Sequence, residues 1–453
     1  MSIIAPLRGS LYNQSLIPNL ADVVTPPYDV IPAAKQVIYH DRHPHNVIRL
    51  ILGQALPEDN ESNNRYTRSA GWFKEWQASQ VLVRDEKPAI YLYELVYNVP
   101  NGARLTRRGF ISLLKLEEFG KGSVYPHERT FSKTKSERFR FSSICHANFS
   151  PGFVVYSDPA MEIQNHLDQG KGHRPVCSFV DEDKLEHRLW AVTDPEVLTW
   201  VCRQMRPKDV FIADGHHRYE TSIAYRDMMR QRYPEAGDRA PFNYRLMYFC
   251  NMSQEGVTIL PAHRMIHRVP DFDREGFLRQ AQDFFEIEAL TYQTGDRAAT
   301  LDKFKQVLSE KGQSSNTIGF YANQDNTFYL LTLRHGALDR APWVKDVPKV
   351  LRAMDTVVLT DLIFTGLLGF TAKDQDDEHK ILYSSITEEA LEKVYQGEHD
   401  LAFILNPTKI EQVEAVARAH LVMPRKSTYF YPKVYSGLVF NPINPEEEIL
   451  ELA

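Results

Sequence analysis

The chain contains the stretch Val210-Phe211-Ile212-Ala213-Asp214-Gly215-His216-His217-Arg218-Tyr219-Glu220-Thr221, in which an apolar run meets one glycine and then a cluster of polar side chains. The run before Asp214 predicts a short buried strand. After Gly215, apolar and aromatic residues recur at helical spacing as far as Met229, which predicts a helix. Asp214 stands where a helix N-cap is expected, and Gly215 permits a sharp turn of the backbone. The stretch therefore predicts a strand, a tight turn and a helix.

The start of this helix is predicted to bind an anion, and phosphate is the natural candidate. A helix N-terminus carries partial positive charge, and His216, His217 and Arg218 add side-chain donors beside it. Adjacent histidines point in different directions on a helix, so at most one of the two faces a ligand. Two interpretations without a ligand stay open: an ordinary N-capped helix start, and a structural ion pair between Asp214 and Arg218.

Length and composition describe an ordinary globular protein with two or three domains. The 453 residues are 43% hydrophobic and carry a net charge of −6, which argues against non-specific nucleic-acid binding. Four cysteines lie far apart without a C-x-x-C pair. The first residues lack the apolar core of a signal peptide, and no run is long enough to span a bilayer. We therefore expect a cytoplasmic protein without a nucleic-acid or membrane partner, in an oligomeric state that the sequence does not indicate.

Strand and helix patterns alternate from end to end, which predicts a mixed α/β or α+β fold. We expect three segments: an N-terminal α/β segment at 1–174, a motif domain at 175–270 closed by a turn at Pro270-Asp271, and a C-terminal α/β segment at 271–453. Further expected elements are strands at 23–30, 89–97 and 108–114, a turn at Asn101-Gly102, helices at 65–77 and 195–205, and a buried helix at 357–370.

A second candidate for anion binding is the segment from Met423 to Lys433. It places Lys426, Ser427 and Lys433 among aromatic residues and prolines, a composition suited to a phosphate or a carboxylate. The alternative interpretation is a packed aromatic loop whose lysines point to solvent.

Three further residues are candidates for catalysis or for binding of the substrate. His127 and Glu128, in a polar loop, are residue types that serve as general base or metal ligand. Arg49 lies in an apolar run and calls for an anionic partner, either structural or substrate. No H-x-x-x-H or H-E-x-x-H spacing is present, so we predict no metal site made by the protein alone. Magnesium carried by a phosphate ligand would leave little trace in a sequence.

Several ordered motifs resemble a bacterial and archaeal family known only as domain of unknown function 1015. The resemblance covers nearly the whole chain and implies no particular reaction. The motifs that carry it are Pro26-Pro27-Tyr28-Asp29-Val30, Asn46-Val47-Ile48-Arg49-Leu50, Pro126-His127-Glu128, Ile212 to Thr221, Leu405-Asn406-Pro407-Thr408 and Met423 to Lys433.

A narrower resemblance joins Asp214-Gly215-His216-His217-Arg218 to the phosphate-binding motif of the ParB, sulfiredoxin and free serine kinase superfamily. It implies a ParB-like strand-turn-helix core in the central segment. Sulfiredoxins carry their catalytic cysteine at the position of His216, so their chemistry is not expected. ParB proteins add a helix-turn-helix for DNA, and no such basic segment is present. The free serine kinases imply nucleotide-dependent phosphoryl transfer to or from serine, with an acidic base outside the motif, for which Glu128 and Asp29 are candidates.

The leading hypothesis is a phosphotransferase or phosphohydrolase that acts on a small phosphorylated metabolite. The resemblance makes serine or phosphoserine the best guess, with ADP or ATP and Mg²⁺ as cofactors. Gly215 and the helix amides would cradle the phosphate, His217 and Arg218 would neutralise it, and His216 would donate to it. Asp214 would cap the helix and position magnesium or the nucleophile. The alternatives are a nucleotide-binding regulatory module without turnover and a purely structural motif.

A second anionic group of the substrate would need its own cations. Lys426 and Lys433 are the candidates for that contact.

Overall fold

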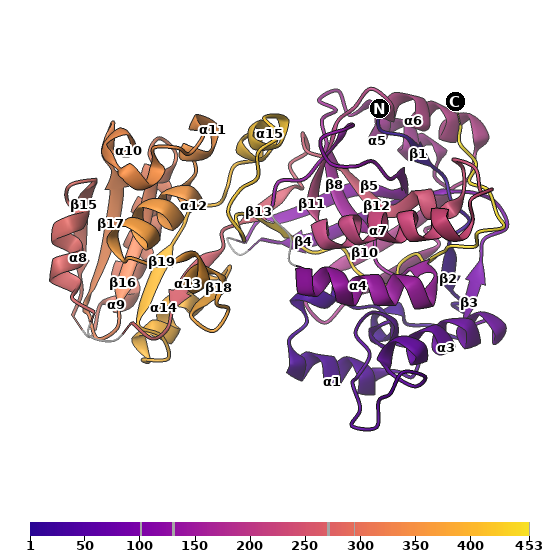
Figure 1. Ribbon diagram of the computed structural model, residues 1–453, viewed down its shortest axis with the longest axis horizontal. Helices are drawn as coiled ribbons and strands as arrows, with labels where there is room; N and C mark the ends of the chain where they lie inside the picture. The colour runs from indigo at the N-terminus through magenta and orange to yellow at the C-terminus, as the bar shows by residue number, and fades with distance from the viewer. Residues whose placement is uncertain (100–101, 129–131, 270–271, 294, 453) are drawn as a thin grey trace. The chain divides into compact units, whose positions relative to one another are not determined.

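The computed structural model describes residues 1–99, 102–128, 132–269, 272–293 and 295–452 (Figure 1). The chain divides into two compact units. Unit 1 comprises Met1–Pro126, Thr130–Thr258 and Phe430–Ala453, and unit 2 comprises His127–Arg129 and Ile259–Tyr429.

Unit 1 is built on a nine-stranded mixed sheet in the order β6-β11-β8-β12-β5-β4-β10-β9, with β1 paired to β5. Most neighbours are antiparallel, whereas β11 runs parallel to β6, and β12 runs parallel to β8. The strands of this sheet are β1 (Ile4–Ala5), β4 (Ile90–Asn98), β5 (Arg104–Lys115), β6 (Val124–Tyr125), β8 (Gly152–Tyr156), β9 (Cys177–Val180), β10 (Glu186–Val192), β11 (Val210–Asp214) and β12 (Tyr244–Asn251). Two small ribbons join β2 (Ser10–Tyr12) to β3 (Leu82–Arg84) and β7 (Ala147–Asn148) to β21 (Asn441–Pro442).

Helices surround this sheet, and three of them share one apolar core with it. Leu167 of α5, Val201 of α6 and Tyr219 of α7 pack in that core with sheet residues such as Phe110 and Phe249. The helices of unit 1 are α1 (Ala33–Arg42), α2 (Ile48–Ile51), α3 (Arg65–Ala78), α4 (Ser132–Cys145), α5 (Glu162–Gly170), α6 (Pro195–Met205) and α7 (His216–Arg232), with 3-10 turns at Leu20–Asp22, Tyr28–Val30 and Pro241–Asn243. Helix α7 lies against β8 and β12, and α4 packs against α7 (Figure 1). The C-terminal half of α7 packs in a second, smaller apolar core around Met229 and Phe242.

Unit 2 is a six-stranded sheet, β15-β17-β16-β19-β14-β18, covered on both faces. One face packs on α8, α15 and a π-helical stretch, and the other packs on α9 and α14. The strands are β14 (His263–Ile266), β15 (Phe285–Thr291), β16 (Thr317–Ala322), β17 (Thr327–Leu333), β18 (Ile381–Ser384) and β19 (Leu401–Ile404). The helices are α8 (Arg274–Ala281), α9 (Arg297–Gly312), α10 (Ala337–Arg340), α11 (Lys349–Arg352), α12 (Asp355–Val357), α13 (Ala372–Asp376), α14 (Thr387–Tyr395) and α15 (Ile410–Arg418), with a 3-10 turn at Pro342–Val344 and the π-helix at Val358–Leu367. Two short strands, β13 (Thr258–Leu260) and β20 (Tyr429–Tyr431), lie at the ends of the segment that forms unit 2.

The mixed α/β class is confirmed, as is the expected strand-turn-helix, which is formed by β11, Gly215 and α7. The two strands expected at 89–97 and 108–114 are β4 and β5, which pair antiparallel. The helices expected at 65–77 and 195–205 are α3 and α6, and the apolar stretch at 357–370 forms the buried π-helix. Asn101 and the Pro270-Asp271 turn lie outside the described residues.

The strand expected at 23–30 is wrong. That run contains one isolated bridge, between Thr25 and Ser436, and ends in a 3-10 turn at Tyr28–Val30. Pro26 and Pro27 have no amide hydrogen to donate to a ladder, so the run cannot continue as a strand.

The sheet of unit 1 does not follow the division that we expected at 174/175. Strands β9 and β10 come from the expected motif domain, yet β10 pairs along its length with β4 of the N-terminal segment. Strand β12 likewise pairs with β5. The motif is therefore embedded in a sheet to which both segments contribute.

Candidate functional site

Strand β11 ends at Asp214 and delivers this carboxylate to one end of the sheet of unit 1. It lies between β6 and β8, and its pairing with β8 shifts register between Ile212 and Asp214. An irregularity of this kind re-aims a side chain at the end of a strand. Val210, Phe211 and Ile212 are buried, as the apolar run predicts, and they anchor the strand beneath the turn.

Gly215 makes the turn from β11 into α7 in a conformation that only glycine adopts without strain. Its φ is 91°, in the left-handed region. A Cβ atom built on it would lie 2.9 Å from Nε of Arg218. Both the backbone angle and the close approach of Arg218 therefore require glycine here.

The expectation that Asp214 caps the helix is wrong. Gly215 is the N-cap residue, and no side chain caps the helix there. The Asp214 carboxylate is instead held by two cations. Arg218 Nη2 donates to Asp214 Oδ2, and Lys433 Nζ donates to Asp214 Oδ1 at 2.5 Å. Burial alone would raise the pKa of Asp214, but Lys433 and Arg218 hold it well below its ordinary range.

Arg218 is buried and lies at the centre of this cluster. Its Nη1 donates to the Pro151 carbonyl at 2.6 Å, in addition to the bond to Asp214. Burial opposes the positive charge, yet Asp214, Asp29 and Tyr28 raise the pKa of Arg218 above its ordinary value. The ion pair that we considered from the sequence therefore exists, and the guanidinium beside it stays charged.

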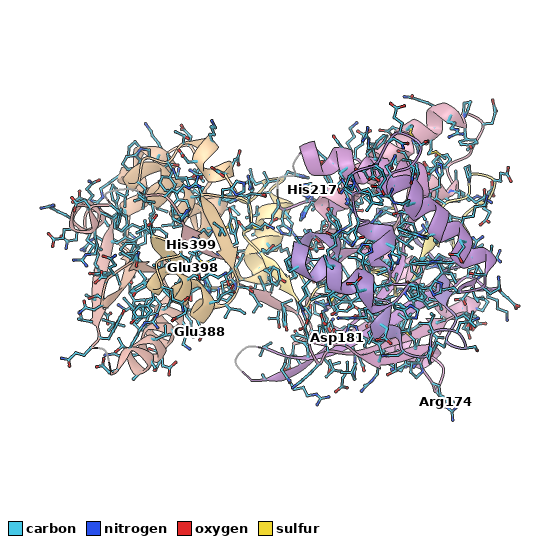
Figure 2. The ribbon with its side chains drawn as sticks, turned by 90° about the horizontal axis from the view of Figure 1, so that it is seen from below. Arg174, Asp181, His217, Glu388, Glu398 and His399 are labelled. Carbon is cyan, nitrogen blue, oxygen red and sulfur yellow. The ribbon has the colours of Figure 1, made fainter. Side chains whose placement is uncertain are left out.

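The two histidines occupy the first turn of α7, before the first helical hydrogen bond, which runs from Tyr219 N to Gly215 O at 3.0 Å. His216 is buried, and its charge adds to the larger effects of Lys433 and Arg218 in lowering the pKa of Asp214, against the opposing effect of burial. His217, which is labelled in Figure 2, is only half-buried. His217 is therefore the histidine that is more accessible to a ligand.

His127, Glu128 and Ser427 are brought together within unit 2. Glu128 Oε1 accepts from the amides of Ser427 and Thr428 at 3.2 and 3.3 Å, and His127 Nε2 lies 2.8 Å from Thr428 Oγ1. Beneath this loop, Arg264 donates to the carbonyls of Arg425 and Lys426. Glu128 thus organises the backbone of the 425–428 loop, and the Lys426 side chain is exposed.

Arg49 has found partners other than the anion that we expected. Its Nε donates to the Pro44 carbonyl at 2.8 Å and its Nη2 to the His40 carbonyl at 2.7 Å, and it lies over the Trp72 ring. Among the described residues, no carboxylate forms a salt bridge with it. These contacts give Arg49 a structural role at the junction of α1 and α2.

Two buried arginines near the motif were missed by sequence reasoning. Arg138 on α4 and Arg245 on β12 line one cavity together with Arg218. A signal for Arg245 was available, since it is a cation in the apolar run 244–251 that forms a strand buried throughout. Arg138 lies in a helix of polar composition, where one more arginine carries no signal.

Within the described ranges, no group of three or more His, Cys, Asp or Glu side chains is placed to hold a metal ion. The same part of the chain contains no helix that is both long and apolar enough to cross a bilayer.

This architecture defines a mixed α/β protein with a charged helix N-terminus at the end of a sheet. The chain belongs to the DUF1015 family of proteins of unknown function, whose model matches residues 4–357. The motifs at 405–408 and 423–433 lie beyond the matched residues. No curated protein matches the chain.

Several solved structures are similar to the chain, at low scores. Free serine kinase in complex with AMP is 13% identical, covers 74% of this chain and 98% of its own, and has a TM-score of 0.30. A conserved hypothetical protein from Pyrococcus furiosus is 13% identical, with 73% and 92% covered and a TM-score of 0.29. SbnI with C-terminal truncation from Staphylococcus aureus is 10% identical, with 75% and 85% covered and a TM-score of 0.31. Identities and TM-scores this low say nothing about the chemistry of this chain. Its chemistry has to be inferred from its own residues.

Proposed function

We propose that the protein is a cytoplasmic phosphoryl-transfer enzyme that acts on a small phosphorylated metabolite, with serine or phosphoserine as the preferred pair. One observation carries the proposal: the N-terminus of α7 lies beside Arg218, Lys433 and two histidines, and Arg218 and Lys433 both pair with the Asp214 carboxylate. Arg218, Lys433 and Asp214 together carry a net charge of +1 beside the helix N-terminus, which favours the binding of a phosphate group.

Each residue around the N-terminus of α7 has a separate role in the proposed phosphoryl transfer. Gly215 turns the backbone from β11 into α7, so that the first-turn amides can donate to phosphate oxygens at the end of the strand. Arg218 and Lys433 neutralise the charge that spreads over those oxygens in the transition state, and His217 donates a hydrogen bond from the accessible side. No nucleophile from the protein is required, because phosphoryl transfer depends mainly on positioning and charge stabilisation.

Asp214 acts in this scheme as the residue that holds the cations. Its two oxygens each accept from a cation, so a phosphate that enters the site competes for Arg218 and Lys433. The same contacts make Asp214 a poor magnesium ligand, because two cations already stand beside it. A magnesium ion would therefore arrive with the phosphates of ADP or ATP, and it would supply further charge neutralisation there.

Asp29 is the base that we favour within unit 1. It follows Tyr28 in a 3-10 turn, its side chain is exposed, and its charge acts on Arg218. An exposed carboxylate can accept the proton of an attacking hydroxyl without disturbing the core. Glu128 remains the second candidate, although its Oε1 is engaged by the 427–428 backbone.

Product detection by mass spectrometry tests the proposal. Purified protein with magnesium is incubated with phosphoserine, with and without ADP, and separately with serine and ATP or pyrophosphate. Serine released only with ADP identifies a reversible kinase, and release without ADP identifies a phosphatase. The absence of product in every tube overturns the proposal. If nucleotide still raises the melting temperature in that case, the protein is a nucleotide-binding module.

A further inference from the structure

Behind Arg218, unit 1 contains a cavity of about 50 Å³ that the proposed reaction does not use. Arg138, Arg218 and Arg245 all line it, together with Tyr28 and Thr221. The three arginines are 7, 6 and 5% exposed. The space suffices for a few waters or one compact group, but a nucleoside would not fit.

The positive charge in this cavity is only partly balanced. Arg218 pairs with Asp214, and Arg138 Nη2 pairs with Glu137 at 2.7 Å. Arg245 donates to the Ser150 carbonyl at 2.8 Å and to the Ser222 hydroxyl at 3.3 Å. Among the described residues, no carboxylate forms a salt bridge with Arg245. Burial, and then the charge of Arg218, lower the pKa of Arg245 to about 9, so it still carries its proton at neutral pH.

Three buried polar atoms of residues that line the cavity have no hydrogen-bond partner within the described part of the chain. They are Nε of Arg138, Nε of Arg245 and Oγ1 of Thr221. Buried donors in folded proteins are nearly always satisfied, so a group of them around one space calls for an acceptor. Arg138 is also held in place from the side, because its guanidinium lies 3.9 Å from the Tyr28 ring centroid.

We propose that this cavity binds a compact oxyanion, namely a phosphate group, either as inorganic phosphate or as the phosphoryl end of a monoester. Three guanidinium groups favour a doubly charged anion over a carboxylate, and the tetrahedral oxygens can accept from several donors at once. The site is distinct from the N-terminus of α7, although both include Arg218. It does not depend on the proposed catalysis, since binding alone defines it.

Binding of inorganic phosphate to the full chain tests this inference, by isothermal titration and by the rise in melting temperature at constant ionic strength. We expect phosphate to bind, and acetate to bind at least tenfold more weakly. Arg245→Met keeps the bulk of the side chain and removes its charge, so phosphate affinity should fall at least tenfold. Thr221→Val removes only the hydroxyl and should weaken binding a few-fold while the fold is kept. Arg232→Met is the matched control for the loss of an arginine charge. Arg232 is exposed at the C-terminal end of α7, so this variant should bind phosphate like the wild type.

A third arm identifies the source of the phosphate group. If phosphoserine shows the same dependence on Arg245 as inorganic phosphate does, the cavity takes a monoester. If only inorganic phosphate shows it, the cavity takes the free anion. Phosphate binding that is unchanged in both Arg245→Met and Thr221→Val, or no binding by the wild type, overturns the inference. Neither result bears on turnover of serine or phosphoserine, so the two proposals fail separately.

Discussion

Lys433 Nζ lies 2.5 Å from Asp214 Oδ1, although 219 positions separate the two residues in the chain. The contact joins the C-terminal segment of unit 1 to the end of β11. The two lysines that the sequence suggested as partners of one anionic group therefore differ in their surroundings. Lys433 pairs with Asp214 in unit 1, whereas Lys426 is exposed in unit 2.

This difference predicts different outcomes for two matched substitutions. Lys433→Met removes a cation from the proposed phosphate site, and we expect turnover to fall by about 10²-fold, as for the loss of one charge-stabilising donor. Lys426→Met removes an exposed charge and should leave the rate within about threefold, since surface changes of this kind have small effects. Steady-state rates on the preferred substrate measure both. Equal effects of the two substitutions would contradict the assignment of Lys433.

The acid stability of the protein should depend on Asp214. Its folded pKa is depressed, so its contribution to stability is present above the unfolded value of about 4 and is lost as the pH falls through the folded pKa. The melting temperature of the wild type should therefore fall more steeply below about pH 4 than that of the D214N variant. Thermal scans across this range provide the comparison. Parallel curves would show that Asp214 is not held ionised by its two cations.

Gly215→Ala should destabilise the protein by about 1–3 kcal/mol, because alanine is strained at positive φ and its Cβ would press on Arg218. Gly71→Ala is the control. Gly71 lies within the exposed part of α3, where an added Cβ meets nothing within 4 Å. That substitution should stabilise the protein by about 0.5–1 kcal/mol. Urea unfolding of both variants tests the pair, and a neutral Gly215→Ala would contradict the geometry of the turn.

Asp29 and Glu128 should respond differently to neutralisation. Asp29→Asn is expected to lower turnover by about 10²-fold, as for loss of a general base, with little change in melting temperature, because the side chain is exposed. Glu128→Gln weakens the acceptor of two backbone amides, so its melting temperature should fall instead. Rates and melting temperatures measured on both variants separate the roles. A loss of rate only in Glu128→Gln would contradict the assignment of Asp29 as the base.

The strand-turn-helix could be predicted from the sequence because its signals are local. The apolar run of β11, the glycine and the helical spacing of α7 each act within a few residues. The role of Asp214 could not be predicted, since the sequence pattern of an N-cap aspartate is the same as that of an ion-pair partner. The fold shows the difference by placing Lys433 beside Asp214. The strand expected at 23–30 failed because two prolines outweigh β-branched neighbours.

The cavity of unit 1 could not be predicted because its parts are distant in sequence. Arg138 comes from α4, Arg218 from α7 and Arg245 from β12, and the packing of α4 on α7 and of α7 on β12 brings them together. A cation in a buried strand, as at Arg245, is nevertheless a signal that can be read from sequence. Arg49 shows the limit of that signal, because backbone carbonyls satisfy it.

In the proposed reaction Arg218 stabilises the transferring phosphoryl group, and turnover by the Arg218→Ala variant is the decisive test of this role. Circular dichroism and a melting curve first establish that the variant is folded, because removal of one partner of a buried ion pair costs about 3–5 kcal/mol. Mass spectrometry then compares product formation by the variant and the wild type. We predict a rate at least about 10²-fold lower in the folded variant. Turnover close to that of the wild type would contradict the claim and leave the Asp214–Arg218 pair a purely structural one.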